Sequence, residues 1–198
     1  MSKEKIYIFD TTLRDGAQTQ GVDFSLNEKE KIAKSLDNLG VDYIEGGWPG
    51  ANPTDTEFFN KDQNFKNANL TAFGMTKKSE HSAKNDPMLS SLINSKSSSV
   101  CLFGKSWDFH VDVALGISND QNLENISESA KHIVNSGKEF MFDAEHFFDG
   151  YKSNPEYAIS CLKAAYDNGA RWIVLCDTNG GTLPVSYTHL TLPTIDRV

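Results

Sequence analysis

Short apolar runs alternate with amphipathic stretches along the chain, and this alternation limits the possible folds more than any other feature. The apolar runs predict strands over residues 6–9, 43–44, 70–73, 100–103, 140–142 and 172–176. They are too short and too continuous to be strands with one solvent-exposed face, so they indicate a buried parallel sheet. Successive runs begin roughly 30 to 40 residues apart, which is the size of a βα unit.

The stretches between the apolar runs predict helices with recognisable ends. Ser25 followed by Glu28 forms a capping box, and Gly40 is expected to end the helix that begins there. The helix expected near residues 81–94 is less regular, and we expect Pro87 to break it. Six strands and five helices in alternation suit either a doubly wound sheet or a (β/α)8 barrel. A whole barrel needs about 250 residues, so a barrel would stop here after its sixth strand.

The last 14 residues, 185–198, depart from this pattern. They are rich in β-branched residues, contain a proline and show no helical periodicity. The segment resembles a translated sequencing-adapter scar. We therefore expect a foreign or artefactual tail in place of the sixth helix that is due here.

Composition narrows the class of protein. The net charge of -8 argues against nucleic acid as a partner, because no basic patch is present. No apolar run reaches the roughly 18 residues of a membrane span, and no signal segment precedes the first strand. The three cysteines lie far apart among apolar residues, as reduced core cysteines do. We expect a cytoplasmic protein.

Polar side chains gather where the predicted strands end, which is where the sites of βα folds collect. These residues are Asp10, Thr11, Arg14, Asp15, Gln18, Glu45, Lys105, His110, Asp143, Glu145, His146, Asp177, Thr178 and Asn179. Such a set suits a hard cation and an anionic substrate. Other roles stay open at single positions, since Asp15 could cap a helix and His110 could belong to the core or the surface. Glu145 follows a Phe-rich strand, so we expect it to have a partner.

The segment FDTTLRDGAQ, residues 9–18, resembles the first-strand motif of the metal-dependent Claisen-condensing barrel family, which includes 2-isopropylmalate, homocitrate and citramalate synthases. The resemblance extends over residues 5 to about 184. The strings GWPG, FGKSWDFHV and FDAEHFFDGY are similar to the citramalate synthase branch. The resemblance implies a TIM barrel truncated after about six strands, with residues 1–184 as the N-terminal part of its catalytic barrel.

The resemblance also implies roles for matching residues. Asp15 would bind a Mg²⁺ or Mn²⁺ ion, and Arg14 would hold the keto acid and stabilise negative charge on its carbonyl oxygen. Glu145, His110 and Asp143 would line the keto-acid pocket, and Glu145 would be catalytic together with Arg14. Thr178 would hydrogen-bond the carboxylate of the keto acid, and Gln18 would support the site. The family draws two further metal ligands from an H-x-H pair that this sequence lacks, so we expect the chain as given to bind metal poorly and to be inactive.

The implied reaction condenses acetyl-CoA with pyruvate to give citramalate and CoA, in isoleucine biosynthesis. The implied full-length protein is a homodimer. A 2-isopropylmalate or homocitrate synthase is the near alternative. A metal-dependent acyl-CoA lyase on the same barrel, or a non-catalytic truncated chain, are alternatives of other classes.

Overall fold

Six parallel strands form one sheet in the computed structural model, which describes residues 5–195. The strands are β1 (Phe9–Asp10), β2 (Tyr43–Gly47), β3 (Asn69–Met75), β4 (Ser99–Lys105), β5 (Glu139–Glu145) and β6 (Trp172–Leu175). Each strand pairs with the next along the chain, in the order β1-β2-β3-β4-β5-β6. A doubly wound sheet reverses its strand order, so this sequential order excludes that fold. The predicted barrel architecture is confirmed as a half-barrel of six strands.

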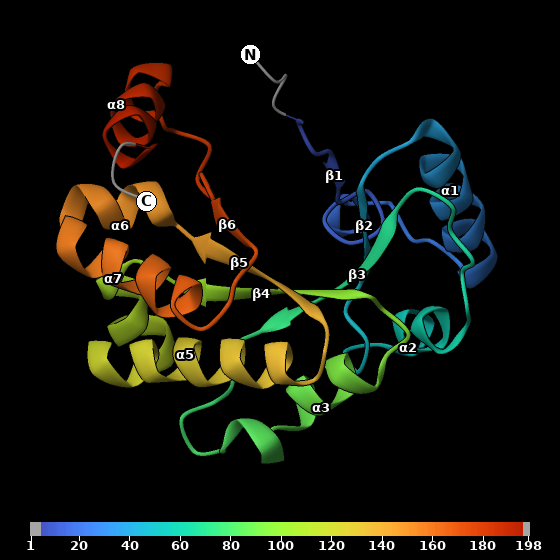
Figure 1. The fold of residues 1–198 in the computed structure, drawn as a ribbon, viewed down its shortest axis with the longest axis horizontal. Helices are drawn as coiled ribbons and strands as arrows, with labels where there is room; N and C mark the ends of the chain where they lie inside the picture. Colours follow the sequence, from blue (N-terminus) through green and yellow to red (C-terminus); the bar gives the residue numbers. More distant parts are fainter. Residues whose placement is uncertain (1–4, 196–198) are drawn as a thin grey trace.

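Five helices connect successive strands. They are α1 (Leu26–Leu39), α2 (Pro53–Asn60), α3 (Pro87–Asn94), α5 (Asn119–Asn135) and α7 (Pro155–Tyr166). Figure 1 shows them following one another around the sheet. The capping box of Ser25 and Glu28 opens α1, and Gly40 follows its end with a left-handed φ of 89°. The expected break at Pro87 is confirmed. A 3-10 turn (Ala83–Asn85) precedes it, and Pro87 begins α3, where Asp86 caps the backbone N–H groups of the first turn.

The two faces of the sheet have different surroundings, because neighbouring residues of a strand point to opposite sides. On the helix-covered face, Ile44, Leu102 and Phe142 belong to the main apolar core. On the inner face, Tyr43, Phe73, Cys101 and Met141 form a second buried cluster. Continuing the alternation from Tyr43 and Met141 toward the carboxyl ends of the strands brings charged residues onto this inner face.

Short helical segments at the carboxyl ends of the strands were not predicted. A single turn, α4 (Asp108–His110), runs into a π-helical turn over Val111–Leu115 after β4. Helix α6 (Phe147–Ser153) follows β5 directly, and its Phe147 and Phe148 are buried in the main core. These segments set the positions of the side chains around the end of the sheet.

The absence of helical structure predicted for residues 185–198 is wrong for the part of the segment that the structure describes. Helix α8 spans Pro184–Ile195, and residues 196–198 lie outside the described range. The proline of this segment, Pro193, falls in the last turn of α8 and does not end the helix before it. The Tyr187 ring packs on Phe148 with centroids 4.4 Å apart. Contacts with the rest of the chain therefore accompany a helix that local propensity does not favour. The foreign origin of the segment stays a prediction.

Candidate functional site

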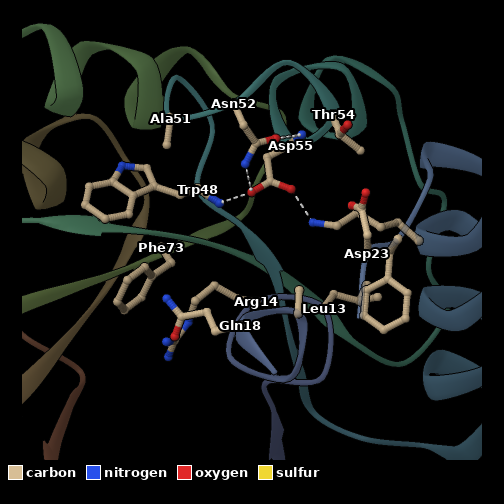
Figure 2. Close-up of a pocket in the computed structure, with 13 residues that line it drawn as sticks. Leu13, Arg14, Gln18, Asp23, Trp48, Ala51, Asn52, Thr54, Asp55 and Phe73 are labelled. Carbon is tan, nitrogen blue, oxygen red and sulfur yellow. Dashed lines mark hydrogen bonds and ion pairs between the residues drawn. The ribbon is translucent and has the colours of Figure 1, made fainter. Parts of the chain in front are cut away.

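A cavity of about 490 Å³ opens at the carboxyl ends of the strands. Its lining combines one arginine, several acids and three aromatic rings. The lining residues are Arg14, Asp15, Gln18, Trp48, Phe73, Phe103, Asp143, Glu145, Cys176, Asp177 and Thr178. Six of the seven residues predicted for the site therefore line one space, and His110 is the exception. A second cavity of about 380 Å³ adjoins it, sharing Arg14, Gln18, Trp48 and Phe73 (Figure 2).

Arg14 is held on several sides. Its Nε donates to Glu45 Oε2 over 2.6 Å, and its Nη1 donates to Asp15 Oδ1 over 3.0 Å. The guanidinium carbon lies 4.0 Å from the centre of the Phe73 ring, in a cation–π contact. Burial by itself would lower the pKa of Arg14, but the carboxylates of Glu45, Asp15 and Asp143 outweigh it and raise the pKa. The guanidinium is thus a fixed, permanent cation at the cavity.

Glu45 supplies the carboxyl group that accepts from that arginine. Its side chain is fully buried, and its Oε1 has no hydrogen-bond partner among the described residues. Burial raises the pKa of Glu45 to about 7, although Arg14 opposes the shift. Glu45 stands among the polar strand-end residues of the sequence but received no role there. The alternation of side chains along a strand could have identified it. Glu45 lies two residues after Tyr43, so both side chains point to the inner face of the sheet.

Two acids come from the end of β5, at positions that face the same way. Burial raises the pKa of Asp143, against the hydrogen bond from the Cys101 thiol. Glu145 forms an ion pair with Lys105 at the end of β4. The expectation that Glu145 would have a partner is confirmed. Both carboxylates lie inside the strand and not after it, because the polar residues continue the ladder of the apolar run.

Asp15 and Gln18 lie in the loop after β1. The Asp15 side chain is 62% exposed and is bound to Arg14. Gln18 is the last residue of a 3-10 turn, and its backbone N–H donates to the Asp15 carbonyl over 2.9 Å. No side-chain capping bond from Asp15 to this turn is present, so the helix-cap alternative finds no support.

His110 lies beside the cavity and not in its lining. It contacts Trp107, with ring centroids 4.7 Å apart, and His146, with centroids 4.4 Å apart. Burial, followed by the neighbouring His146, lowers the pKa of His110. Thr178 does line the cavity, and its Oγ1 accepts a hydrogen bond of 2.9 Å from the backbone of His146. The substrate-binding role of His110 stays a prediction.

Oxygen donors suited to a divalent cation are present. Hard cations such as Mg²⁺ prefer carboxylate oxygens, and Asp15 and Asp143 both face the cavity. Only one oxygen of Asp15 is bound to Arg14. Ligand atoms of Glu45, Cys101 and Asp143 also lie within 4.8 Å of one another. Since burial raises the pKa of the Cys101 thiol well above its usual value, that sulfur is a poor ligand for a hard ion. The carboxylates fit such a cation and the thiol does not.

None of the helices in the described part of the chain combines the length and the apolarity needed to cross a membrane. Cys101, Cys161 and Cys176 are all free thiols.

Comparison with known proteins identifies relatives over nearly the whole chain. The HMGL-like family model matches residues 5–196. The "(R)-citramalate synthase" of Aquifex aeolicus is 54% identical over 196 residues, covering 98% of this chain and 37% of that protein. Four further relatives with the same name are 44–50% identical. The chain therefore spans little more than a third of the length of these relatives.

More distant relatives and a solved structure agree on the fold. "2-isopropylmalate synthase 1" of Caldanaerobacter subterraneus is 32% identical over 205 residues, covering all of this chain and 50% of that protein. The crystal structure of Bacillus subtilis HMG-CoA lyase superposes with a TM-score of 0.80 at 17% identity, covering 98% of this chain and 65% of the other. At this identity the similarity shows the barrel fold alone.

Proposed function

This chain belongs to the HMGL-like family, and on that premise we propose that the protein condenses acetyl-CoA with pyruvate to give citramalate and CoA. The observation that carries the proposal is a single cavity lined by the fixed Arg14, by carboxylates and by the aromatic rings of Trp48, Phe73 and Phe103. Identity of 54% to a citramalate synthase, against 32% to a 2-isopropylmalate synthase, supports this branch. The proposal includes a cytoplasmic location, which the three free thiols support. It also includes a homodimer and a role in isoleucine biosynthesis.

The chemistry requires a bond between two carbon atoms. The methyl group of acetyl-CoA loses a proton, the resulting carbon attacks the keto carbon of pyruvate, and water then cleaves the thioester to release CoA. A divalent cation, Mg²⁺ or Mn²⁺, held by Asp15 with Asp143 beside it would polarise the keto carbonyl as a Lewis acid. The remaining roles belong to the chain itself.

Arg14 is the residue that stabilises the negative charge developing on the keto oxygen. With Nε committed to Glu45 and Nη1 to Asp15, the guanidinium can present its remaining N–H groups to an anionic oxygen. A preorganised donor of this kind stabilises the oxyanion without reorganising during the reaction. Thr178 accepts the His146 N–H with its oxygen, so its own hydroxyl hydrogen is available for the pyruvate carboxylate.

Aromatic rings bound the space for the keto-acid side chain. Phe73 and Phe103 stack with centroids 5.4 Å apart, and Trp48 meets both edge-on. This rigid wall supports a keto acid with a small side chain such as the pyruvate methyl group. Asp143 and Glu145 complete the pocket on the β5 side, where Lys105 fixes Glu145.

The test is an assay of the full gene product with acetyl-CoA and each of three keto acids, following release of the CoA thiol. We expect kcat/KM for pyruvate to exceed that for 2-oxoisovalerate and 2-oxoglutarate by at least about tenfold. Preference for either larger acid would replace the proposal with an isopropylmalate or homocitrate synthase. Cleavage of 3-hydroxy-3-methylglutaryl-CoA would indicate a lyase, and no turnover of any substrate would support a non-catalytic chain.

The metal part of the proposal has a separate test. Removal of divalent ions with EDTA should abolish thiol release, and Mg²⁺ or Mn²⁺ should restore it. Mn²⁺ should also raise the thermal unfolding midpoint of the EDTA-treated protein, and the Asp15→Asn variant should lose that rise. An equal rise in the variant would show that the ion binds elsewhere.

A further inference from the structure

A buried ion pair lines the second cavity, which shares Trp48 and Phe73 with the first. Lys29 on α1 is 4% exposed and Asp55 on α2 is 7% exposed, and their side chains are in contact. The Lys29 ammonium also donates to the carbonyl of Gly46 over 2.8 Å. Burying two charges is expensive unless each is well paired. The pair therefore calls for an explanation beyond the packing of two helices.

The Asp55 carboxylate holds the segment that follows β2. Its Oδ2 accepts hydrogen bonds from the backbone N–H of Trp48, over 2.8 Å, and from Asn52 Nδ2, over 2.9 Å. Asn52 in turn accepts from the Asp55 backbone over 2.7 Å. Figure 2 shows the carboxylate between Trp48 and Asn52, and its other oxygen contacts the Lys29 ammonium. One carboxylate thus binds both ends of the turn.

The backbone at Gly47 is shaped around the same carboxylate. Gly47 has a φ of 135°, which L side chains rarely adopt, and a Cβ at this position would lie 2.5 Å from the Asp55 carboxyl carbon. Only glycine allows the chain to pass so close to the acid. The next residue is Trp48, whose backbone N–H donates to Asp55. The contact with Asp55 therefore fixes the backbone from which the Trp48 side chain projects.

Trp48 transmits this position to the site. Its ring packs edge-on against Phe73, with centroids 5.7 Å apart, and Arg14 lies over the face of Phe73. Trp48 lines both cavities. We propose that Lys29 and Asp55 are positioning residues for the active site, which hold Trp48 and through it the Phe73 face on which Arg14 rests. This inference relies on the proposed keto-acid condensation for its kinetic readout but not for its structural one.

The test compares two charge-neutral double variants. Lys29→Met/Asp55→Asn keeps a carbonyl oxygen that can accept from the Trp48 N–H, whereas Lys29→Met/Asp55→Leu has the same approximate size but no acceptor. We expect the KM for pyruvate to be about tenfold higher in the leucine variant than in the asparagine variant, since an unsatisfied buried N–H would displace the turn. The KM for acetyl-CoA should change by less than about twofold. A fall in kcat with both KM values unchanged, or equal pyruvate KM values in the two variants, would overturn the proposal.

A milder variant guards against loss of folding. Asn52→Ala removes one donor to Asp55 and the N-cap of α2, and it should raise the pyruvate KM by about threefold. Ser118→Ala, which removes the cap of α5, is its matched control. Lys61→Met removes an exposed ion pair with Glu30 that joins the same two helices. Both controls should leave the pyruvate KM unchanged, and a rise in either would assign the effect to general destabilisation.

A spectroscopic readout separates this proposal from the proposed function. Residues 1–198 contain three tryptophans, so Trp107→Phe/Trp172→Phe, together with Trp→Phe at any tryptophan of the full gene product outside this range, leaves Trp48 as the sole emitter. In that background, acrylamide should quench the leucine double variant more strongly than the asparagine one. If the wild-type protein does not turn over pyruvate, the proposed function fails while this comparison still decides the positioning role. Equal quenching would refute the positioning role.

Discussion

Arg14 Nε donates to Glu45 Oε2 over 2.6 Å, and the accepting side chain is fully buried. The two residues come from the loop after β1 and from β2, so their contact joins the first two units of the barrel. The fork of the guanidinium is oriented by this bond and by the second one to Asp15. The guanidinium group at the cavity is thus fixed in its orientation as well as in its charge.

The direction of the guanidinium makes Arg14 hard to replace. In Arg14→Lys, the flexible ammonium cannot contact Glu45, Asp15 and the Phe73 face together. We expect kcat/KM for pyruvate to fall by about a hundredfold, measured by thiol release. Arg171→Lys is a matched control, because Arg171 lies over Trp172 at the start of β6 and does not line the cavity. Retention of most activity in Arg14→Lys would show that charge alone suffices.

Thr178 joins the ends of the last two described strands. Its Oγ1 accepts the His146 N–H over 2.9 Å, and the residue lines the cavity. Thr178→Val should lower the unfolding free energy by about 1 kcal/mol and raise the pyruvate KM by about tenfold. Thr182→Val removes a hydroxyl that donates to Asp177 and does not line the cavity, so it should cost similar stability without the change in KM. Equal KM values in the two variants would contradict a substrate contact at Thr178.

Helix α6 packs against the segment that follows β4 through Gly150, a residue without a side chain. A Cβ on Gly150 would lie 2.9 Å from the Ser106 carbonyl carbon and from the Trp107 Cα, which are main-chain atoms that cannot move aside cheaply. Gly150→Ala should therefore reduce the unfolding free energy by about 3 kcal/mol in urea titrations. Gly181→Ala, where a Cβ would meet nothing within 4 Å, should change it by less than about 0.5 kcal/mol.

The parts of the fold that the sequence predicted are those with local causes. The Ser25–Glu28 capping box involves residues three apart, and it forms as expected. The apolar run over residues 6–9 predicted a strand, yet the described ladder with β2 comprises Phe9–Asp10, and Ile6 is 86% exposed. Apolarity shows that a segment can be buried, but pairing depends on a neighbour that the local sequence does not reveal.

The residues of the candidate site also divide into those that the local sequence predicted and those that depend on tertiary packing. Six of its seven predicted residues line one cavity because each lies at the carboxyl end of a strand or in the loop after it, and parallel strands end together. Glu45 received no role, since the run over residues 43–44 was too short to show which face it occupied. The Lys29–Asp55 pair was also missed, because its residues lie on two helices and meet only through tertiary packing.

The buried Glu45 also predicts how stability depends on pH. Its pKa is about 7 in the folded protein against an ordinary value of 4.5, so the native state binds the proton more tightly than the unfolded chain. The resulting contribution to stability is fully present below pH 4.5 and is lost as the pH rises through about 7. Integrated over that window, the loss is about 3 kcal/mol.

Urea titrations in EDTA at intervals from pH 5 to pH 8 can isolate this contribution. Glu45→Gln keeps an oxygen that can accept from Arg14 but cannot ionise, so the variant should gain stability relative to wild type as the pH rises. Glu28→Gln is the control, because hydrogen bonds from Ser25 lower the pKa of Glu28 from its ordinary 4.5; its contribution is lost only below that pH, so this variant should run parallel to wild type from pH 5 to pH 8. A wild-type curve that runs parallel to that of Glu45→Gln would mean that Glu45 stays ionised throughout, with Arg14 outweighing its burial.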